Sequence, residues 1–203
     1  MRTTELETFY LKRWEMLPDF IKKEGVDPTV VYDRDYLAQP GASPVMLVGE
    51  APGGEEVAQG RPFVGQAGKN LKRLLEKAGL DRSKILITNL FPFRTFAQGA
   101  KGVINRTPKT LELEAGAALL EVEIGIVRPS AIILLGLSAH RGVMRSSWRD
   151  KVQSLTLGSL VKEQGGCEPR FWGLSYHPSP LNFNQPSKRA ALEDFFERLA
   201  TMV

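Results

Sequence analysis

The sequence predicts an α/β protein with a doubly wound, mainly parallel four-stranded sheet and helices on both faces, an α/β/α sandwich. Four short apolar runs alternate with stretches of helical periodicity, and they cover residues 45–48, 84–89, 131–135 and 170–176. Nearly continuous apolar runs are typical of strands buried on both faces, and strands that alternate with helices favour a parallel sheet. Ligands of such sheets bind beyond the carboxyl ends of the strands. The segments expected to carry the chemistry are therefore 49–54, 89–94, 136–138 and 177–181.

Helices are predicted around these strands. Apolar side chains recur at steps of three and four over residues 3–23, where Pro18 kinks or ends the helix. A later helix is expected to start at residues 107–108, with proline in its first turn, and the last helix to start with Ser187 as its N-cap. Residues 139–166 have no clear pattern and are expected to hold a helix and an antiparallel excursion.

Length and composition predict a single domain over residues 1–203, with 1–40 as a helical segment packed on the core. The chain has 203 residues, of which 42% are hydrophobic and 25% charged, enough for a full core. Cys167 is the only cysteine, which excludes an internal disulfide and a four-cysteine metal site and fits a reducing compartment. With no signal peptide pattern and no apolar run of membrane-spanning length, a cytoplasmic protein is expected. The net charge of +4 permits a polyanionic partner without requiring one.

Three positions near the strand ends suit a planar heterocycle. Glycines in the segment 49–54 allow a ligand to approach the backbone closely, and Glu50 adds a carboxylate; the spacing matches neither a dinucleotide fingerprint nor a Walker loop. Asn89 follows a strand and offers a donor and an acceptor to the edge of a base, while Phe63 offers a stacking face. Each has a purely structural alternative: a glycine-rich turn with a solvated Glu50 for 49–54, turn capping for Asn89, and core packing for Phe63.

The segment 177–182 is unusual for a simple connection, because two prolines stiffen a loop with His177 at one end and Leu181 near the other. A neutral imidazole can stabilise a developing oxyanion, and an exposed leucine can fill a gap in a base stack. Lys188 and Arg189 follow in the first turn of the next helix, where cations oppose the helix dipole, so phosphate contact is a reason for their presence. A structural histidine and a solvated basic face are the alternatives.

Taken together, five segments resemble the uracil-DNA glycosylase superfamily, especially its family 4. They read GEAPG at 49–53, GRPFVGQAG at 60–68, TN at 88–89, NRTP at 105–108 and HPSPL at 177–181. The resemblance covers about residues 45–200 and falls largely on the loops that the strand pattern selects. It implies a monomeric, monofunctional enzyme of base excision repair, which flips uracil out of DNA and hydrolyses its N-glycosidic bond with water. No cofactor is expected, and the partner is uracil-containing DNA of the nucleoid, single- or double-stranded.

The resemblance also implies a role for each loop. Phe63 stacks on the flipped uracil, Asn89 reads its amide edge, and His177 hydrogen-bonds the O2 atom that gains charge as the bond breaks. Glu50 is the carboxylate beside the attacking water, and the pocket wall consists of Gly49, Ala51, Pro52 and Gly53. The residues expected to contact DNA around the segment 177–182 and the next helix are Pro178, Ser179, Pro180, Leu181, Lys188 and Arg189, with Leu181 as the wedge.

Two departures concern the family 4 metal cluster and the water. Family 4 proteins usually hold an iron–sulfur cluster on four cysteines, whereas residues 90–94 here read LFPFR. No cluster is expected, and Phe91 and Phe93 are predicted to fill its place with aromatic side chains of the first helix, Phe9, Tyr10 and Trp14. Ala51 stands where family 1 enzymes have a water-activating aspartate. The water is therefore oriented by Glu50, or by Asn89 and backbone carbonyls.

The stretch 95–103 is a third departure, because it is longer than the corresponding family 4 link. It is rich in glycine and is expected to be a mobile surface loop, with DNA contact by Arg94 or Lys101 as the alternative. No histidine lies between Asn89 and Pro108, which disfavours covalent trapping of the DNA.

Two other functions remain open from the sequence. A glycosylase for other deaminated bases, such as hypoxanthine or xanthine, would keep the fold and change the pocket. A non-catalytic module that binds damaged or single-stranded DNA would explain Ala51.

Overall fold

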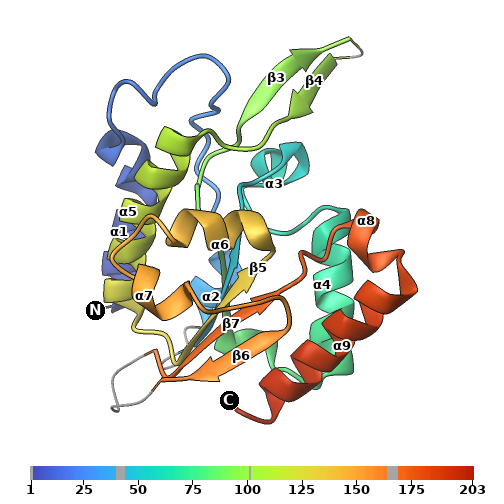
Figure 1. The fold of residues 1–203 in the computed structure, drawn as a ribbon. Coiled ribbons are helices and arrows are strands. Elements are labelled where there is room, and N and C mark those ends of the chain that lie inside the picture. The colour runs from blue at the N-terminus through green and yellow to red at the C-terminus, as the bar shows by residue number, and fades with distance from the viewer. Residues whose placement is uncertain (1, 40–43, 101, 164–168) are drawn as a thin grey trace.

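A computed structural model of the chain describes residues 2–39, 44–100, 102–163 and 169–203. Its central sheet has five strands in the order β2-β1-β5-β7-β6 (Figure 1). Their bounds are β1 Val45–Gly49, β2 Ile85–Asn89, β5 Ala131–Leu135, β6 Ser159–Lys162 and β7 Phe171–Ser175. The first four in the order are parallel, as predicted, and β6 is antiparallel to β7. The prediction of four strands is therefore wrong by one edge strand.

Helices and a separate hairpin complete the fold. The remaining elements are α1 Arg2–Met16, α2 Arg34–Ala38, α3 Gly54–Gln59, α4 Gln66–Lys77, η1 Arg82–Lys84, β3 Phe96–Gly99, β4 Gly102–Asn105, α5 Thr110–Val127, α6 Leu137–Val143, α7 Arg149–Val152, α8 Pro180–Phe183 and α9 Pro186–Ala200. The first helix ends before Pro18, as its ring requires. The helix expected from residues 107–108 begins at Thr110. Lys109 is its N-cap residue, and the backbone N–H of Lys109 donates a hydrogen bond to the Glu112 side chain in the first turn. The last helix begins at Pro186 rather than with Ser187 as cap, because proline fits the first helical position.

The two faces of the sheet carry separate cores, which is the doubly wound arrangement predicted. Alternate residues of β1 point to opposite faces, so Leu47 lies in one core and Met46 in the other. The first core packs against α4 and α9, through residues such as Leu71 and Phe196, and the second packs against α1, α5, α6 and α7. No helix in the described ranges is long and apolar enough to cross a membrane.

Aromatic side chains fill the space between α1, α5 and the segment that follows β2. Phe91 and Phe93 are fully buried, and the Phe93 ring meets the Trp14 ring edge-on with centroids 5.0 Å apart. Phe9 and Tyr10 belong to the same core. Aromatic packing is thus found where the sequence predicts it, and it holds α1 against the body of the protein.

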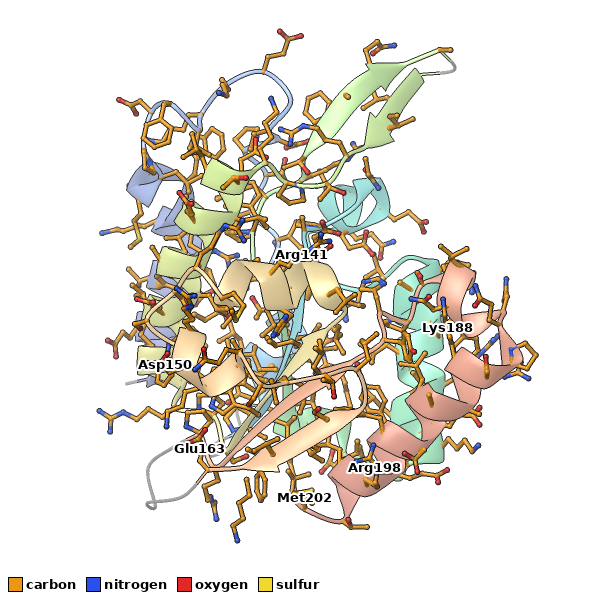
Figure 2. All side chains as sticks on the ribbon, in the orientation of Figure 1. Arg141, Asp150, Glu163, Lys188, Arg198 and Met202 are labelled. Atoms are coloured by element: carbon orange, nitrogen blue, oxygen red, sulfur yellow. The ribbon has the colours of Figure 1, made fainter. Side chains whose placement is uncertain are left out.

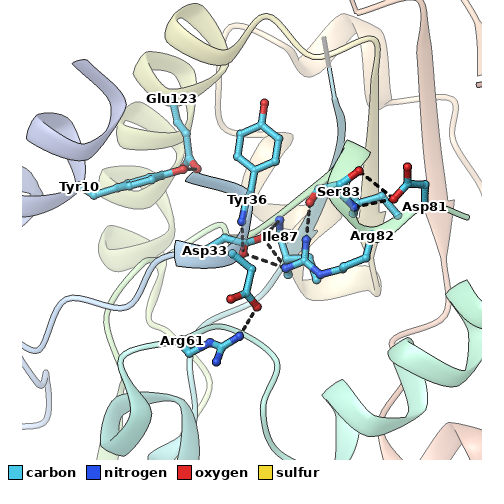
Figure 3. A network of polar contacts seen from close by, with 11 residues as sticks. Tyr10, Asp33, Tyr36, Arg61, Asp81, Arg82, Ser83, Ile87 and Glu123 are labelled. Carbon is cyan, nitrogen blue, oxygen red and sulfur yellow. Dashed lines mark hydrogen bonds and ion pairs between the residues drawn. The ribbon is translucent and has the colours of Figure 1, made fainter. Parts of the chain in front are cut away.

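Buried polar groups fix the N-terminal segment to the sheet. The Asp33 carboxylate accepts hydrogen bonds from the backbone N–H groups of Tyr36 (3.1 Å) and Ile87 (2.9 Å) and pairs with Arg82 at 2.7 Å (Figure 3). Because Ile87 belongs to β2, these bonds attach the chain around α2 to a central strand.

A second buried carboxylate, Glu123 of α5, lies behind the end of β2. It accepts hydrogen bonds from the Tyr10 hydroxyl at 2.8 Å and the Thr88 hydroxyl at 3.1 Å, and Arg13 lies 3.9 Å away. Burial raises the pKa of Glu123. The bond to Thr88 fixes the strand at the residue before Asn89.

Substitution of two glycines of α5 tests whether this helix packs directly on the segment after β2. A Cβ at Gly116 would lie 2.5 Å from the Leu90 carbonyl oxygen and 2.9 Å from the Phe91 Cα, whereas a Cβ at Gly125 would meet nothing within 4 Å. Gly116→Ala is expected to lower the free energy of unfolding by ~1–3 kcal/mol through overpacking. The matched control Gly125→Ala should raise it by up to about 1 kcal/mol through helix propensity. Urea denaturation measures both, and equal stabilisation by the two changes would contradict the packing described.

Candidate functional site

A pocket of about 330 Å³ opens at the carboxyl ends of β1, β2 and β7. Its lining includes Glu50, Phe63, Asn89 and His177. The site lies where the order of the sheet reverses, because β1 and β5 are neighbours whose onward connections run over opposite faces. Such a switch point is the expected ligand site of a doubly wound sheet.

One carboxylate joins the two glycine-rich loops that form the pocket wall. Glu56 of α3 accepts hydrogen bonds from the backbone N–H of Gly53 at 3.1 Å, of Val64 at 3.0 Å and of Gly65 at 2.9 Å. These N–H groups lie at the N-terminal ends of α3 and α4, where backbone donors lack partners within the helix. Glu56 therefore fixes both loops in one geometry around the pocket.

Phe63 lies between these loops in a backbone conformation that is rare for a residue with a side chain. Its φ is 53°, in the left-handed region. Its carbonyl group lies against the backbone of Gly68, in space that any larger residue would fill. The ring faces His177, with ring centroids 5.9 Å apart and planes 37° apart. A flat ligand between the loops would meet this aromatic face.

Asn89 is the last residue of β2 and pairs in register with Gly49, the last residue of β1. Its side chain is 93% buried (7% exposed), and a Cβ at Gly49 would lie 2.5 Å from its Oδ1 atom. Glycine at position 49 thus leaves the space that the Asn89 amide and the edge of the Phe63 ring occupy. The amide lines the pocket with its donor and acceptor fixed by a central strand.

His177 follows β7 and enters the pocket across Gly136. Gly136 has a φ of 95°, and a Cβ there would lie 2.9 Å from the His177 Cβ. Burial lowers the pKa of the His177 imidazole, and the nearby Glu56 carboxylate raises it by a smaller amount. The net shift is downward, so the imidazole is neutral at physiological pH and can donate one hydrogen bond.

Glu50 lies between the pocket and a second cavity of about 360 Å³, which Ser138, Tyr176 and Lys188 also line. Burial raises the pKa of the Glu50 carboxyl group, while a hydrogen bond with Ser138 and the charge of Arg141 oppose that rise. Its Oε1 atom is buried and has no hydrogen-bond partner among the described residues. The carboxylate thus has one oxygen free to accept a proton.

The structure places the predicted DNA-contacting residues in different surroundings. Ser179 caps α8, and Leu181 on that helix is 75% exposed at the pocket side of the chain. Pro178 is buried, and its carbonyl oxygen accepts a hydrogen bond from Asn70 at 2.9 Å, so it anchors the loop. Pro180 is the exposed first residue of α8.

The predicted cations are likewise separated. Lys188 bonds Asn182 at 3.3 Å and lies over the Tyr176 ring, at the start of α9 (Figure 2). Arg189 is exposed and lies within electrostatic reach of Lys77 on α4, away from the second cavity. Arg94 lies at the base of the β3–β4 hairpin, whereas Lys101 falls outside the described residues.

The expected mobile loop over 95–103 is instead an antiparallel hairpin of β3 and β4. Its short strands read as a loop because glycine occupies positions 99 and 102 next to the turn. Gly102 has a φ of 118°, which favours glycine at this tight reversal.

Comparison with known proteins identifies the family. The family model described as the uracil DNA glycosylase superfamily matches residues 37–200. The chain belongs to the uracil DNA glycosylase superfamily. It is 35% identical over 156 residues to the type-4 uracil-DNA glycosylase of Pyrobaculum aerophilum, covering 73% of this chain and 72% of that protein. It is also 39% identical over 156 residues to the type-4 enzyme of Thermotoga maritima, covering 74% and 73%.

The iron–sulfur cluster implied by the family 4 resemblance does not fit this superfamily member. The sequence has one cysteine, and the buried Phe91 and Phe93 lie in the segment where a cluster cysteine is expected. The close approach of Gly116 to Leu90 leaves no room between α5 and that segment. Within the described ranges, no group of three or more histidine, cysteine or acidic side chains could hold a metal ion.

Among the residues near the pocket, the sequence did not single out Glu56, Asn105, Ser138 and Arg141, although Ser138 lies in the selected segment 136–138. Asn105 and Glu56 line the pocket, and Ser138 and Arg141 act on Glu50. Asn105 lies within the NRTP segment that supports the resemblance, which is the one signal that pointed to it. The other three depend on contacts between loops that are distant in sequence.

The neutral state of His177 can be measured by NMR titration of the imidazole. Its pKa is expected below 6.5, because burial disfavours the charged form. Glu56→Gln should lower the pKa further, since it removes an anion that favours the imidazolium. The chain has two histidines, so the imidazole signals that remain in His140→Gln belong to His177. A pKa at or above 6.5 would contradict the burial described.

Proposed function

We propose that the chain is a monofunctional uracil-DNA glycosylase, a hydrolase that releases uracil from DNA and leaves an abasic site. The observation that carries the proposal is the meeting of Phe63, Asn89 and a neutral His177 in one pocket of about 330 Å³. Family membership supports the same activity class. A base within a duplex cannot reach these groups, so the nucleotide must be flipped out of the stack.

Base recognition follows from the groups that line the pocket. Phe63 stacks on the face of uracil, and the Asn89 amide pairs with its edge, the oxygen accepting from N3–H and the NH₂ group donating to O4. Ala51, Pro52 and Gly53 form the wall behind the base, and Gly49 leaves room for the Asn89 amide and the Phe63 ring. The fixed amide selects uracil over bases with another donor and acceptor pattern.

Hydrolysis breaks the bond between C1′ of the deoxyribose and N1 of uracil. The bonding electrons leave with the base, and negative charge develops on its O2 atom. The neutral His177 donates a hydrogen bond to that oxygen, in a water-poor site where such a bond is stronger than in bulk solvent. Water adds to C1′, and its proton passes to the ionised Glu50 carboxylate. Asn89 or backbone carbonyls are the alternative groups that orient the water.

The partner in this proposal is uracil-containing DNA, single- or double-stranded, and the reaction is the first step of base excision repair. Ser179, Pro180, Lys188 and Arg94 would contact the strand, and Leu181 would enter the gap left by the flipped base. We place this activity in a single chain acting as one domain, in the cytoplasm at the nucleoid.

Uracil excision is tested with a labelled oligonucleotide that holds one uracil, treated with alkali to cleave abasic sites. The native chain should give alkali-dependent cleavage, and His177→Ala should lower kcat by about 10²–10³-fold by removing the oxyanion donor. Asn89→Asp should also lose activity on uracil. The control His140→Gln changes the other histidine, which bonds the Val152 carbonyl outside the pocket, and should retain activity.

Other outcomes of this assay separate the alternatives. If hypoxanthine DNA is cleaved while uracil DNA stays intact, the chain is a glycosylase for another deaminated base, and the fold assignment is unaffected. Binding of uracil DNA without base release would make the chain a non-catalytic binding module.

The role of Glu50 is tested by the pH dependence of kcat. The ionised carboxylate accepts the proton, so the rate falls as the pH drops through the pKa of Glu50. Because burial raises that pKa, the acid limb should lie above pH 4.5. Glu50→Gln should lower kcat by about 10²-fold and abolish this limb. An unchanged limb in Glu50→Gln would assign the proton to another group.

A further inference from the structure

The β3–β4 hairpin lies outside the central sheet and forms a two-stranded sheet of its own. Its strands pair in register from Phe96 opposite Asn105 to Gly99 opposite Gly102. Figure 1 shows the hairpin standing out beyond α3 at the carboxyl end of the sheet. None of the groups proposed to bind uracil belongs to this projection.

The base of the hairpin is held firmly. The Thr95 carbonyl accepts from the Arg106 N–H at 3.0 Å, and the Thr95 hydroxyl donates back to the Arg106 carbonyl at 2.5 Å. The Arg94 Nε donates to the Asn105 side chain at 2.8 Å. Arg106 pairs with the Glu112 carboxylate through bonds of 2.6 and 2.7 Å. The hairpin therefore leaves the body in a fixed direction beside the pocket.

A groove of about 410 Å³ runs between the hairpin and the N-terminal ends of α3 and α4. It is continuous with the uracil pocket, because both are lined by Gly53, Glu56, Ala67 and Asn105. A strand whose uracil enters the pocket must continue on both sides of it. Leu181 and α8 lie on the His177 side of the pocket, and the groove leads away along the hairpin.

The surface of the groove suits a base better than a phosphate. Val103 is 52% exposed and gives an apolar wall, and the Arg94 guanidinium lies over the Phe96 ring at 5.7 Å. A Cβ at Gly54 would lie 3.3 Å from that guanidinium, so Arg94 packs against the bare backbone of Gly54 at the edge of the groove. The Glu55 carboxylate also lines the groove and repels a phosphate, but it accepts hydrogen bonds from amino groups.

We propose that this groove receives the base next to the flipped uracil on the same strand, an inference that rests on the proposed glycosylase activity. Val103 and Arg94 contact the face of that base, and Glu55 accepts a hydrogen bond from its exocyclic amino group. Cytosine has such a group at its edge, whereas thymine presents an oxygen there. The chain therefore prefers uracil with cytosine rather than thymine on one side.

The test measures kcat/KM on single-stranded oligonucleotides with cytosine or thymine on each side of one uracil. The native chain should favour cytosine about tenfold on one side alone. Glu55→Ala should remove that preference, and Val103→Ser should lower kcat/KM about tenfold for either neighbour through lost base contact. Val161→Ser, at a 44% exposed valine of the edge strand β6, is the matched control and should change nothing.

Several results would overturn the proposal. They are the same kcat/KM for both neighbours in the native chain, a preference that survives Glu55→Ala, or a Val103→Ser loss confined to duplexes, which would place Val103 against the complementary strand. Each of these leaves uracil excision intact, so the proposed function stands while the groove assignment fails. If the native chain releases no uracil from any of these substrates, the proposed function is overturned and the groove assignment falls with it.

Discussion

The arrangement of the pocket depends on the three hydrogen bonds that the Glu56 carboxylate accepts from Gly53, Val64 and Gly65. They bring two glycine-rich loops from different helices to one point and satisfy backbone donors that a helix start leaves without partners. Phe63 lies between the bonded residues, and its left-handed backbone persists because its surroundings fix it. The same carboxylate raises the pKa of His177, against the larger effect of burial. One side chain thus sets both the shape of the pocket and part of its charge.

Burial also shifts the pKa values of two titratable groups in the pocket, Glu50 and His177. It lowers the pKa of His177 and raises the pKa of Glu50, so both groups are shifted toward their neutral forms. A neutral imidazole can donate to a developing oxyanion without first losing a proton, and a carboxylate with a raised pKa is a better proton acceptor. The sheet supplies the positions, since Glu50, Asn89 and His177 follow or end three of its parallel strands.

Much of the fold was predictable because the parallel strands are buried on both faces and read as apolar runs. The edge strand β6 lies within residues 139–166, where an antiparallel excursion was expected, but its bounds were not predictable because Ser159–Lys162 is half-buried and exposed and has no apolar run. The hairpin was mistaken for a mobile loop, since Gly99 and Gly102 beside its turn resemble a flexible linker. Asn89, Phe63 and His177 were found because each follows a recognisable strand or lies in a motif. Glu56 and Arg141 were missed because their effects arise from contacts that only the tertiary structure brings about. Ser138 lies in a selected segment but was not singled out, for the same reason.

The central claim is that Asn89, Phe63 and His177 form a site for uracil. Titration of the ¹⁵N-labelled chain with free uracil, followed by two-dimensional NMR, tests this most directly, because it needs neither DNA nor turnover. Saturable shifts of the Asn89 side-chain amide and the His177 imidazole, absent with equal concentrations of hypoxanthine, are the predicted result. Shifts with hypoxanthine and none with uracil, or saturable shifts that leave both side chains unmoved, would contradict the account.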